Sequence, residues 1–228
     1  MKIPPVIIVS SLVVALRLSA GTFDEAKPHG RACVAVVDSS ATGKEEAFRS
    51  TDTPRPGKRI NVYLDASTKC TTVVAALRKD GKLANDWRPQ VVELAGDFED
   101  IQVPKSPATW DWSDGAEPFD FYILFLSPGA KESDELKKLV SAMQSAKADQ
   151  PVLAMQTNKL REILSRIAAE KDRGSQVVSD PEIGGVFRGS AFPWRQYANG
   201  ANFSSERAGV IIIPSSRGPE TKDAAVKP

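Results

Sequence analysis

The sequence predicts an α+β fold: a mainly antiparallel β-sandwich-like domain with a two-helix insertion. Three observations lead to this prediction. Short segments rich in β-branched and aromatic residues are separated by turn signals. Two consecutive segments with helical spacing follow them, and strand patterns then return. Strands grouped before and after a pair of helices favour this arrangement over alternating βαβ units.

The first half of the chain supplies most of the predicted strands. A period of two over residues 59–65 places Ile60, Val62 and Leu64 on one face, as in a half-buried strand. An Asp-Gly pair in residues 79–82 predicts a tight turn. The other strands in this part are expected over residues 33–37, 71–77, 90–94, 98–103 and 118–126.

Helical spacing then replaces the strand pattern. Apolar residues recur at i, i+3, i+4 and i+7 from Leu136 and again from Leu160, which predicts two amphipathic helices. Thr157 is the expected N-cap of the second helix. Final strands are expected over residues 185–189 and 208–214.

The N-terminus resembles a secretory signal peptide. It pairs a basic start at Lys2 with an apolar run from Val6 to Leu16 and small residues up to Ala20. The run is too short for a membrane span, which needs about 20 apolar residues. We therefore expect a secreted or periplasmic protein, with no membrane span after cleavage.

The predicted domain organisation follows from these patterns. It has a signal peptide at 1–20, a flexible lead at 21–32, and a single β-rich domain at 33–214 with its helical insertion at 131–173. A disordered tail is expected at 215–228, where the sequence is polar.

Charge and composition argue against a nucleic-acid partner. The chain has 30 Lys plus Arg and 29 Asp plus Glu, and the two signs are interleaved rather than gathered in a basic stripe. No glycine-rich phosphate or dinucleotide loop occurs, so no cofactor is expected. The expected partner is a protein or another component of the cell envelope.

The two cysteines, Cys33 and Cys70, each lie in or beside an apolar run. In an oxidising compartment, a pair at the start of two strands predicts a disulfide between neighbouring β elements. Two buried free thiols are the alternative. A metal site is not expected, because the chain has a single histidine and no C-x-x-C spacing.

Residues suited to catalysis are few. His29 lies in the polar lead, where we expect a solvated side chain rather than a catalytic base. Carboxylates gather in two groups, from Asp97 to Asp100 and from Asp111 to Asp120. A pair of them would suit a carboxylate-dependent hydrolase or a calcium site, whereas solvated surface loops are the simpler interpretation.

The candidate ligand-binding residues are Trp110, Trp112, Asp111 and Asp114. The two tryptophans stand at i and i+2, so an extended segment projects both from one face. Such a face could stack on sugar rings, as in a carbohydrate-binding module, or it could cover the edge of the sandwich.

Four stretches resemble a bacterial domain family of unknown function that occurs in exported proteins and beside caspase-like peptidases and kinases. They are residues 56–62, 79–83, 91–103 and 119–128, and the resemblance spans residues 57–147. It implies an accessory, non-catalytic module and transfers no catalytic residue. The sequence thus predicts an exported binding module of unknown ligand, with a hydrolase or a carbohydrate-binding module as alternatives.

Overall fold

A computed structural model describes residues 24–38, 44–48, 57–105, 108–112, 118–147, 151–169, 186–187 and 192–215. It has two antiparallel sheets and two helices, which confirms the predicted fold class. The signal peptide, residues 216–228 of the predicted tail and Asp114 lie outside the described residues.

Sheet A contains seven of the described strands, in the order β6-β3-β1-β2-β9, with β10 paired to β1 and β7 paired to β3. Their bounds are β1 His29–Asp38, β2 Glu45–Ala47, β3 Lys58–Ala66, β6 Ile101–Val103, β7 Trp110–Asp111, β9 Val186–Phe187 and β10 Asn199–Asn202. The long central pair, β1 and β3, is antiparallel over nine residue pairs, from Gly30 opposite Ala66 to Asp38 opposite Lys58.

Sheet B has the order β11-β8-β4-β5, and every neighbouring pair is antiparallel. Its strands are β4 Cys70–Arg78, β5 Gln90–Leu94, β8 Phe119–Leu126 and β11 Gly209–Pro214. The 3-10 helix η1, Ala84–Asp86, lies between β4 and β5, and a second 3-10 helix, η2 Trp194–Tyr197, precedes β10.

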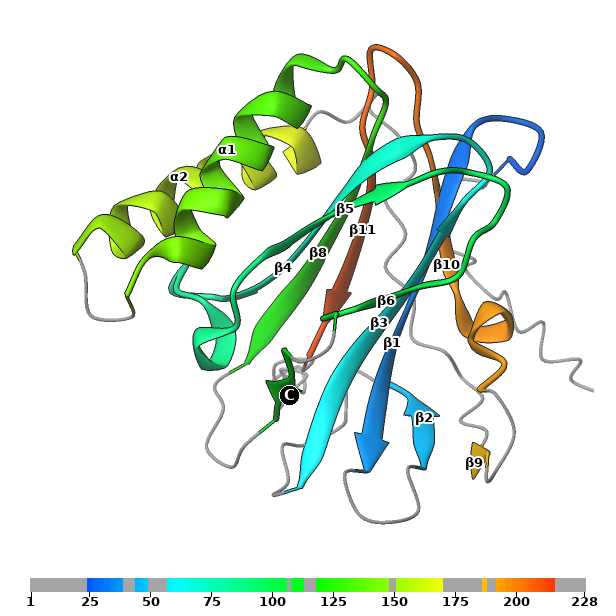
Figure 1. Cartoon of the computed structure of the whole chain (residues 1–228), viewed down its shortest axis with the longest axis horizontal. Coiled ribbons are helices and arrows are strands. Elements are labelled where there is room, and N and C mark those ends of the chain that lie inside the picture. The colour runs from blue at the N-terminus through cyan, green and yellow to red at the C-terminus, as the bar shows by residue number, and fades with distance from the viewer. Residues whose placement is uncertain are drawn as a thin grey trace, which may run out of the picture.

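The molecule is built in layers, with the helices on one face of sheet B and sheet A on the other (Figure 1). Helix α1 spans Lys131–Ser145 and α2 spans Pro151–Ala169, both within the predicted insertion. The sequence of strand β4 contains an apolar run because both faces of the strand are buried. Val74 and Ala76 face sheet A, whereas Val73 and Ala75 belong to the cluster under the helices.

The first strand begins earlier than expected. It includes His29, Gly30 and Arg31, which the sequence assigned to a flexible lead, because residues 29–32 pair with β10 and residues 30–32 also pair with β3. The prediction that the His29 side chain is solvated is therefore wrong. His29 is 4% exposed, and its Nδ1 atom lies 2.8 Å from the carbonyl oxygen of Lys27.

The predicted disulfide between Cys33 and Cys70 is also wrong, since both thiols are free and buried. Cys70 faces the core between the sheets. Cys33 points to the opposite side of sheet A, into a cluster with Phe192 and Trp194. Side chains alternate along a strand, so Ala32 and Val34 face the core and Cys33 between them cannot.

Two smaller expectations are corrected in the second half of the chain. Helix α2 begins at Pro151, so Thr157 is an interior residue whose hydroxyl donates to the carbonyl oxygen of Leu153 at 2.8 Å. Residues 98–100 precede β6 rather than extending it, because Asp97 and Phe98 form a turn with φ values of 54° and 57°. Neither described helix is both long enough and apolar enough to cross a membrane.

Candidate functional site

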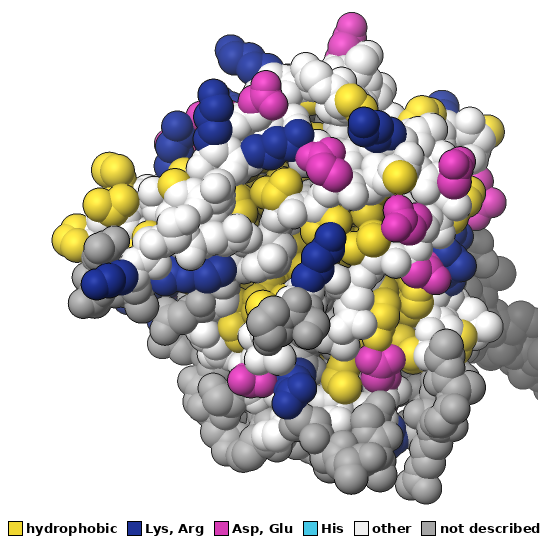
Figure 2. Space-filling view, in the orientation of Figure 1, with side chains coloured by type: hydrophobic (Ala, Val, Ile, Leu, Met, Phe, Trp, Pro, Cys, Tyr) yellow, Lys and Arg dark blue, Asp and Glu magenta, His cyan; other side chains and the backbone are white. Residues whose placement is uncertain are grey.

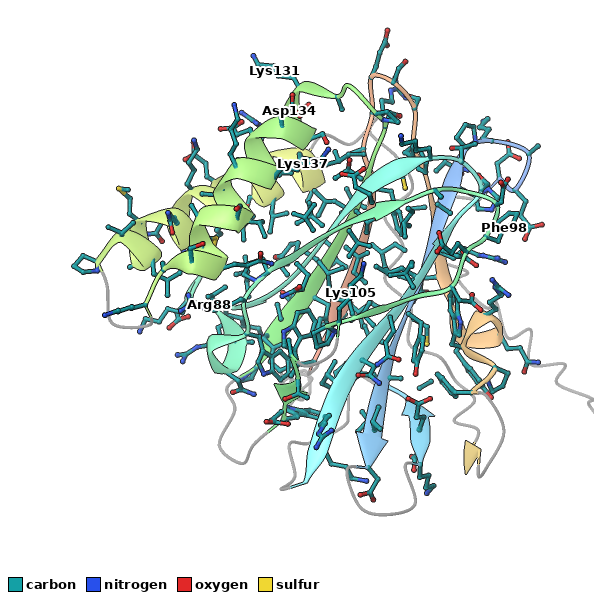
Figure 3. The ribbon with its side chains drawn as sticks, viewed as in Figure 1. Arg88, Phe98, Lys105, Lys131, Asp134 and Lys137 are labelled. Carbon is teal, nitrogen blue, oxygen red and sulfur yellow. The ribbon has the colours of Figure 1, made fainter. Side chains whose placement is uncertain are left out.

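The two sheets diverge on the side of the molecule formed by β5 and β6. Figure 2 shows hydrophobic side chains in a strip below the helices, where the seam between the sheets faces the viewer. Val91 and Ile101 pack partly buried against the core on this side. Arg88 lies at one end of β5 and Phe98 lies beyond the other end (Figure 3).

A pocket of about 610 Å³ opens at the Arg88 end of this seam. We call it the Trp pocket, and it is lined by Asn85, Trp87, Arg88, Gln90, Ala108, Thr109, Trp110, Asp111 and Gln144. These residues come from η1 and β5 of the sheet B side, from β7 of sheet A and from α1. The pocket thus lies where three structural layers meet.

The floor of the Trp pocket is a pair of parallel indoles. The rings of Trp87 and Trp110 lie 5.6 Å apart at 11°. The Trp87 Nε1 atom donates to the carbonyl oxygen of Asp111 at 3.1 Å. Because one indole follows η1 and the other belongs to β7, the stack joins the two sheets.

Two side chains that line the Trp pocket each carry a buried hydrogen-bond donor that no described residue accepts. The Nδ2 atom of Asn85 and the Nη1 atom of Arg88 are buried and have no hydrogen-bond partner among the described residues. A buried unpaired donor destabilises a fold by about 1 to 3 kcal/mol. Such donors in a pocket are explained if a ligand supplies the acceptors.

The remaining amides of the pocket are held by the main chain. Gln144 donates to the carbonyl oxygen of Pro89 at 3.0 Å, and Gln90 donates to that of Arg88 at 3.3 Å. Arg88 itself is anchored by one bond, from Nη2 to the carbonyl oxygen of Ala146 at 3.1 Å.

Backbone geometry is unusual at Asn85. Its φ and ψ angles of 45° and 32° place it in the left-handed region, which asparagine tolerates better than most residues. Strained conformations of this kind gather at binding and catalytic sites. Here the conformation occurs inside η1, where the Asn85 side chain lines the pocket.

The structure divides the predicted ligand-binding residues. Trp110 and Asp111 line the Trp pocket, whereas Trp112 belongs to the core and stacks at a tilt on Phe48. Trp110 and Trp112 share a face, as expected, but they are only 3% and 2% exposed. Neither ring therefore presents an open face to a sugar.

Asp111 is exposed and forms an ion pair with Arg59, whose Nε atom lies 3.5 Å from its Oδ1 atom. It marks one end of β3, since Asp111 is paired with Arg59. The other acidic group lies at the far end of the same strand, where the Phe98 amide donates to the carbonyl oxygen of Ala66. Seven residues of strand separate these ends by about 23 Å.

The two acidic groups therefore do not form one carboxylate pair, which needs about 5 to 9 Å. Asp120 is in the other sheet, opposite Leu77. Burial raises its pKa, while Lys79 lowers it by a smaller amount. Among the described residues, no group of three His, Cys, Asp or Glu side chains is placed to hold a metal ion.

A buried ion network at the Phe98 end was not predicted from the sequence. Asp65 is fully buried and accepts two bonds from Arg31, at 2.9 and 2.7 Å, and one from Arg195 at 2.9 Å. Arg195 also donates to Asp100 and to the carbonyl oxygen of Phe98. The network fixes the loop between β5 and β6.

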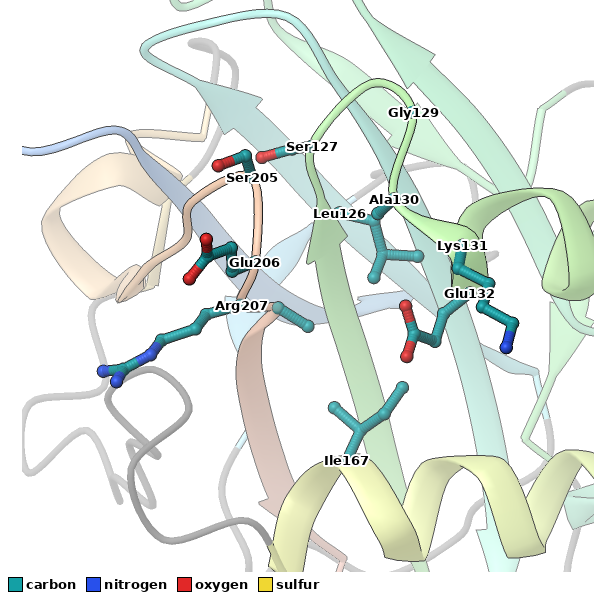
Figure 4. A pocket seen from close by; sticks show the side chains of 11 residues that line it. Leu126, Ser127, Gly129, Ala130, Lys131, Glu132, Ile167, Ser205, Glu206 and Arg207 are labelled. Atoms are coloured by element: carbon teal, nitrogen blue, oxygen red, sulfur yellow. The ribbon is translucent and has the colours of Figure 1, made fainter.

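A second pocket, of about 200 Å³, lies between the β8–α1 and β10–β11 connections (Figure 4). Charged side chains of both signs line it, including Lys131, Glu132, Glu206 and Arg207. The unpartnered buried atoms of the described chain include none in its lining. The Trp pocket is therefore the better candidate site.

No protein-family model, curated protein or solved structure matches this chain. The resemblance noted from residues 57–147 stays a prediction.

Sequence reasoning identified two of the Trp pocket residues and missed the polar ones. Arg88, Asn85 and Gln144 are separated by up to 59 positions and meet only when η1 and α1 pack on the sheets. The one local signal was Arg88 standing between Trp87 and Pro89 at the start of an apolar strand.

Proposed function

We propose that this protein is an exported, non-catalytic binding module, and that its Trp pocket binds a carboxylate-bearing segment of a protein partner. The observation that carries the proposal is a pair of buried donors, Asn85 Nδ2 and Arg88 Nη1, for which the described residues provide no acceptor. A guanidinium next to an amide suits a carboxylate, because charge-assisted hydrogen bonds are the stronger ones.

The chemistry of the lining favours a peptide over a sugar. Sugar binding relies on exposed aromatic faces, and Trp87 and Trp110 are stacked on each other with at most 5% exposure. The pocket instead offers amide and guanidinium groups, which complement peptide groups and carboxylates. Carboxylate-dependent hydrolysis is not favoured, because the two acidic groups lie at opposite ends of β3.

Selection from a phage-displayed library of random peptides with free C-termini tests this function. We expect the wild-type protein to enrich related sequences, and we expect Arg88→Gln to abolish that enrichment. Arg166→Gln is the matched control, because Arg166 is exposed on α2 outside the pocket. No enrichment by the wild type, or equal enrichment by Arg88→Gln, would reject the proposal.

A second measurement follows from the same selection. A synthetic six-residue peptide of the enriched sequence is expected to bind at least about tenfold more tightly than its C-terminal amide, which corresponds to about 1.4 kcal/mol. Arg88→Lys keeps the charge but loses the planar fork, so it should retain part of the affinity. Circular dichroism of each variant checks that it folds.

Export is tested separately. If residues 1–20 are a signal peptide, mass spectrometry of the protein from its native host will find the mature N-terminus after Ala20 or close to it. Recovery of the chain with Met1 from the cytosolic fraction would contradict export without bearing on the pocket.

A further inference from the structure

Strand β5 is the last described strand of sheet B, and it begins at the Trp pocket. It pairs with β4 on one side, and the sheet order places no described strand on the other. An edge strand presents unpaired N–H and C=O groups along its outer side. Gln90–Leu94 holds no proline or lysine, the residues that commonly block such an edge.

The side chains on both faces of β5 already contact other parts of the protein. Val92 and Leu94 face the core between the sheets. On the other face, Val91 packs under the helices, and Glu93 forms an ion pair with Lys137 of α1 at 2.8 Å. A partner can therefore contact β5 only through the backbone N–H and C=O groups of its outer edge.

The β5 edge leads directly into the Trp pocket. Gln90 is both the first residue of β5 and part of the pocket lining, and Arg88 lies two residues earlier. Figure 3 shows Arg88 at this end of the strand. A segment that pairs with β5 would therefore place one of its ends at the pocket.

The charge at Arg88 decides the direction of such a segment. A strand parallel to β5 would bring its N-terminal ammonium group to Arg88, and the two positive charges would repel each other. An antiparallel strand would bring its C-terminal carboxylate to the guanidinium of Arg88, whose Nη1 atom donates to no described residue. The antiparallel direction also continues the pattern of sheet B, in which every pair is antiparallel.

We infer that β5 accepts the extended C-terminal segment of a protein partner as an additional antiparallel strand, with the terminal carboxylate held at Arg88 in the Trp pocket. This inference rests on the proposed function. Main-chain hydrogen bonds along the edge supply affinity in this mode of recognition, and the pocket at its end supplies specificity. The five residues of β5 would pair with about 17 Å of extended peptide.

N-methylated versions of the selected six-residue peptide test the strand addition without altering the protein. In a paired strand, alternate N–H groups point to the neighbour. One alternate set of N-methyl groups should weaken binding at least about tenfold, equivalent to about 1.4 kcal/mol. The intervening set, whose N–H groups point away from β5, is the matched control and should bind within about twofold of the parent peptide.

Hydrogen exchange of the protein gives an independent reading. Binding of the unmodified peptide should slow amide exchange at alternate residues within 90–94, and α2 amides should not change. Equal binding by both N-methylated sets, with no added protection in β5, would overturn strand addition. If the C-terminal amide still bound more weakly in that case, the carboxylate pocket would stand and only the strand pairing would fall.

Discussion

Trp87 stacks on Trp110 with ring centroids 5.6 Å apart, and the stack joins the segment that follows η1 to strand β7 of sheet A. Next to it, Arg88 and Asn85 carry donors that no described residue satisfies. The aromatic pair closes the end of the sandwich and provides a rigid floor for these polar groups. In our account, stability and recognition therefore depend on the same corner of the fold.

Removal of the buried carboxylate of Asp65 should destabilise the fold. Asp65→Asn leaves Arg31 and Arg195 without the charge that three hydrogen bonds now use. The two arginines stay in contact with water, at 23% and 43% exposure, so we expect the free energy of unfolding to fall by about 1.5 to 3 kcal/mol, as for the loss of hydrogen bonds to a charged group. Chemical denaturation measures the change.

Asp100→Asn is the control for Asp65→Asn. Asp100 contacts the same arginine, Arg195, but its side chain is 56% exposed. Its loss should lower the free energy of unfolding by no more than about 1 kcal/mol. Similar losses of unfolding free energy in the two variants would show that the burial of Asp65 does not increase its contribution to stability.

A methyl group at position 30 should also be disruptive. A Cβ atom on Gly30 would stand 2.1 Å from the Phe125 ring, in the core between the sheets. Overpacking of this kind lowers the free energy of unfolding by about 1 to 3 kcal/mol. Gly30→Ala should therefore lower the denaturation midpoint, and the loss should be smaller in a Phe125→Leu background. Equal losses in both backgrounds would exclude the predicted clash.

Features of the fold and of the Trp pocket could be predicted from the sequence where the interacting residues are close together in the chain. Strand β5 and both helices were predicted because their patterns are local. The disulfide failed because spacing along the chain does not show which face of a strand a residue occupies. Cys70 begins β4, whereas Cys33 lies in the middle of β1 and faces away from the core.

Pairing in three dimensions also explains the elements that were missed. Strands β2, β7 and β10 are only two to four residues long, too short for a period of two to be visible. They exist because the long strands β1 and β3 offer partners. The polar lining of the Trp pocket was missed for the same reason, since Gln144 and Arg88 meet only after α1 packs on sheet B.

Both thiols should resist modification in the native protein. Burial is the main cause that raises the pKa of Cys33 to about 12 and that of Cys70 to about 11, so little thiolate forms at pH 8. Treatment with iodoacetamide at pH 8 should alkylate neither thiol in the folded state and both in guanidinium chloride. A denatured, unreduced sample that takes up no label would instead demonstrate a disulfide.

The half-buried carboxylate of Asp120 should make stability depend on pH in a defined direction. Burial raises its pKa above the ordinary value of 3.8, so the folded state binds the proton more tightly than the unfolded state. This residue therefore lowers stability as pH rises through its folded pKa, and the penalty persists above that value.

Asp120→Asn removes that penalty. The variant should be more stable than the wild type at pH 7, and the difference should shrink as pH falls toward 3.8. Denaturation curves of both proteins at several pH values measure it. An advantage that grows toward low pH would contradict the assignment.

The most direct test of the Trp pocket is a nuclear magnetic resonance titration that follows the indole N–H signals of the four tryptophans. The probe is the selected six-residue peptide with a free carboxylate. We expect the Trp87 and Trp110 signals to shift in a saturable manner while the Trp194 signal stays in place, and we expect Arg88→Gln to abolish the shifts. Saturable binding with Trp87 and Trp110 unmoved would place the ligand elsewhere and contradict the central claim.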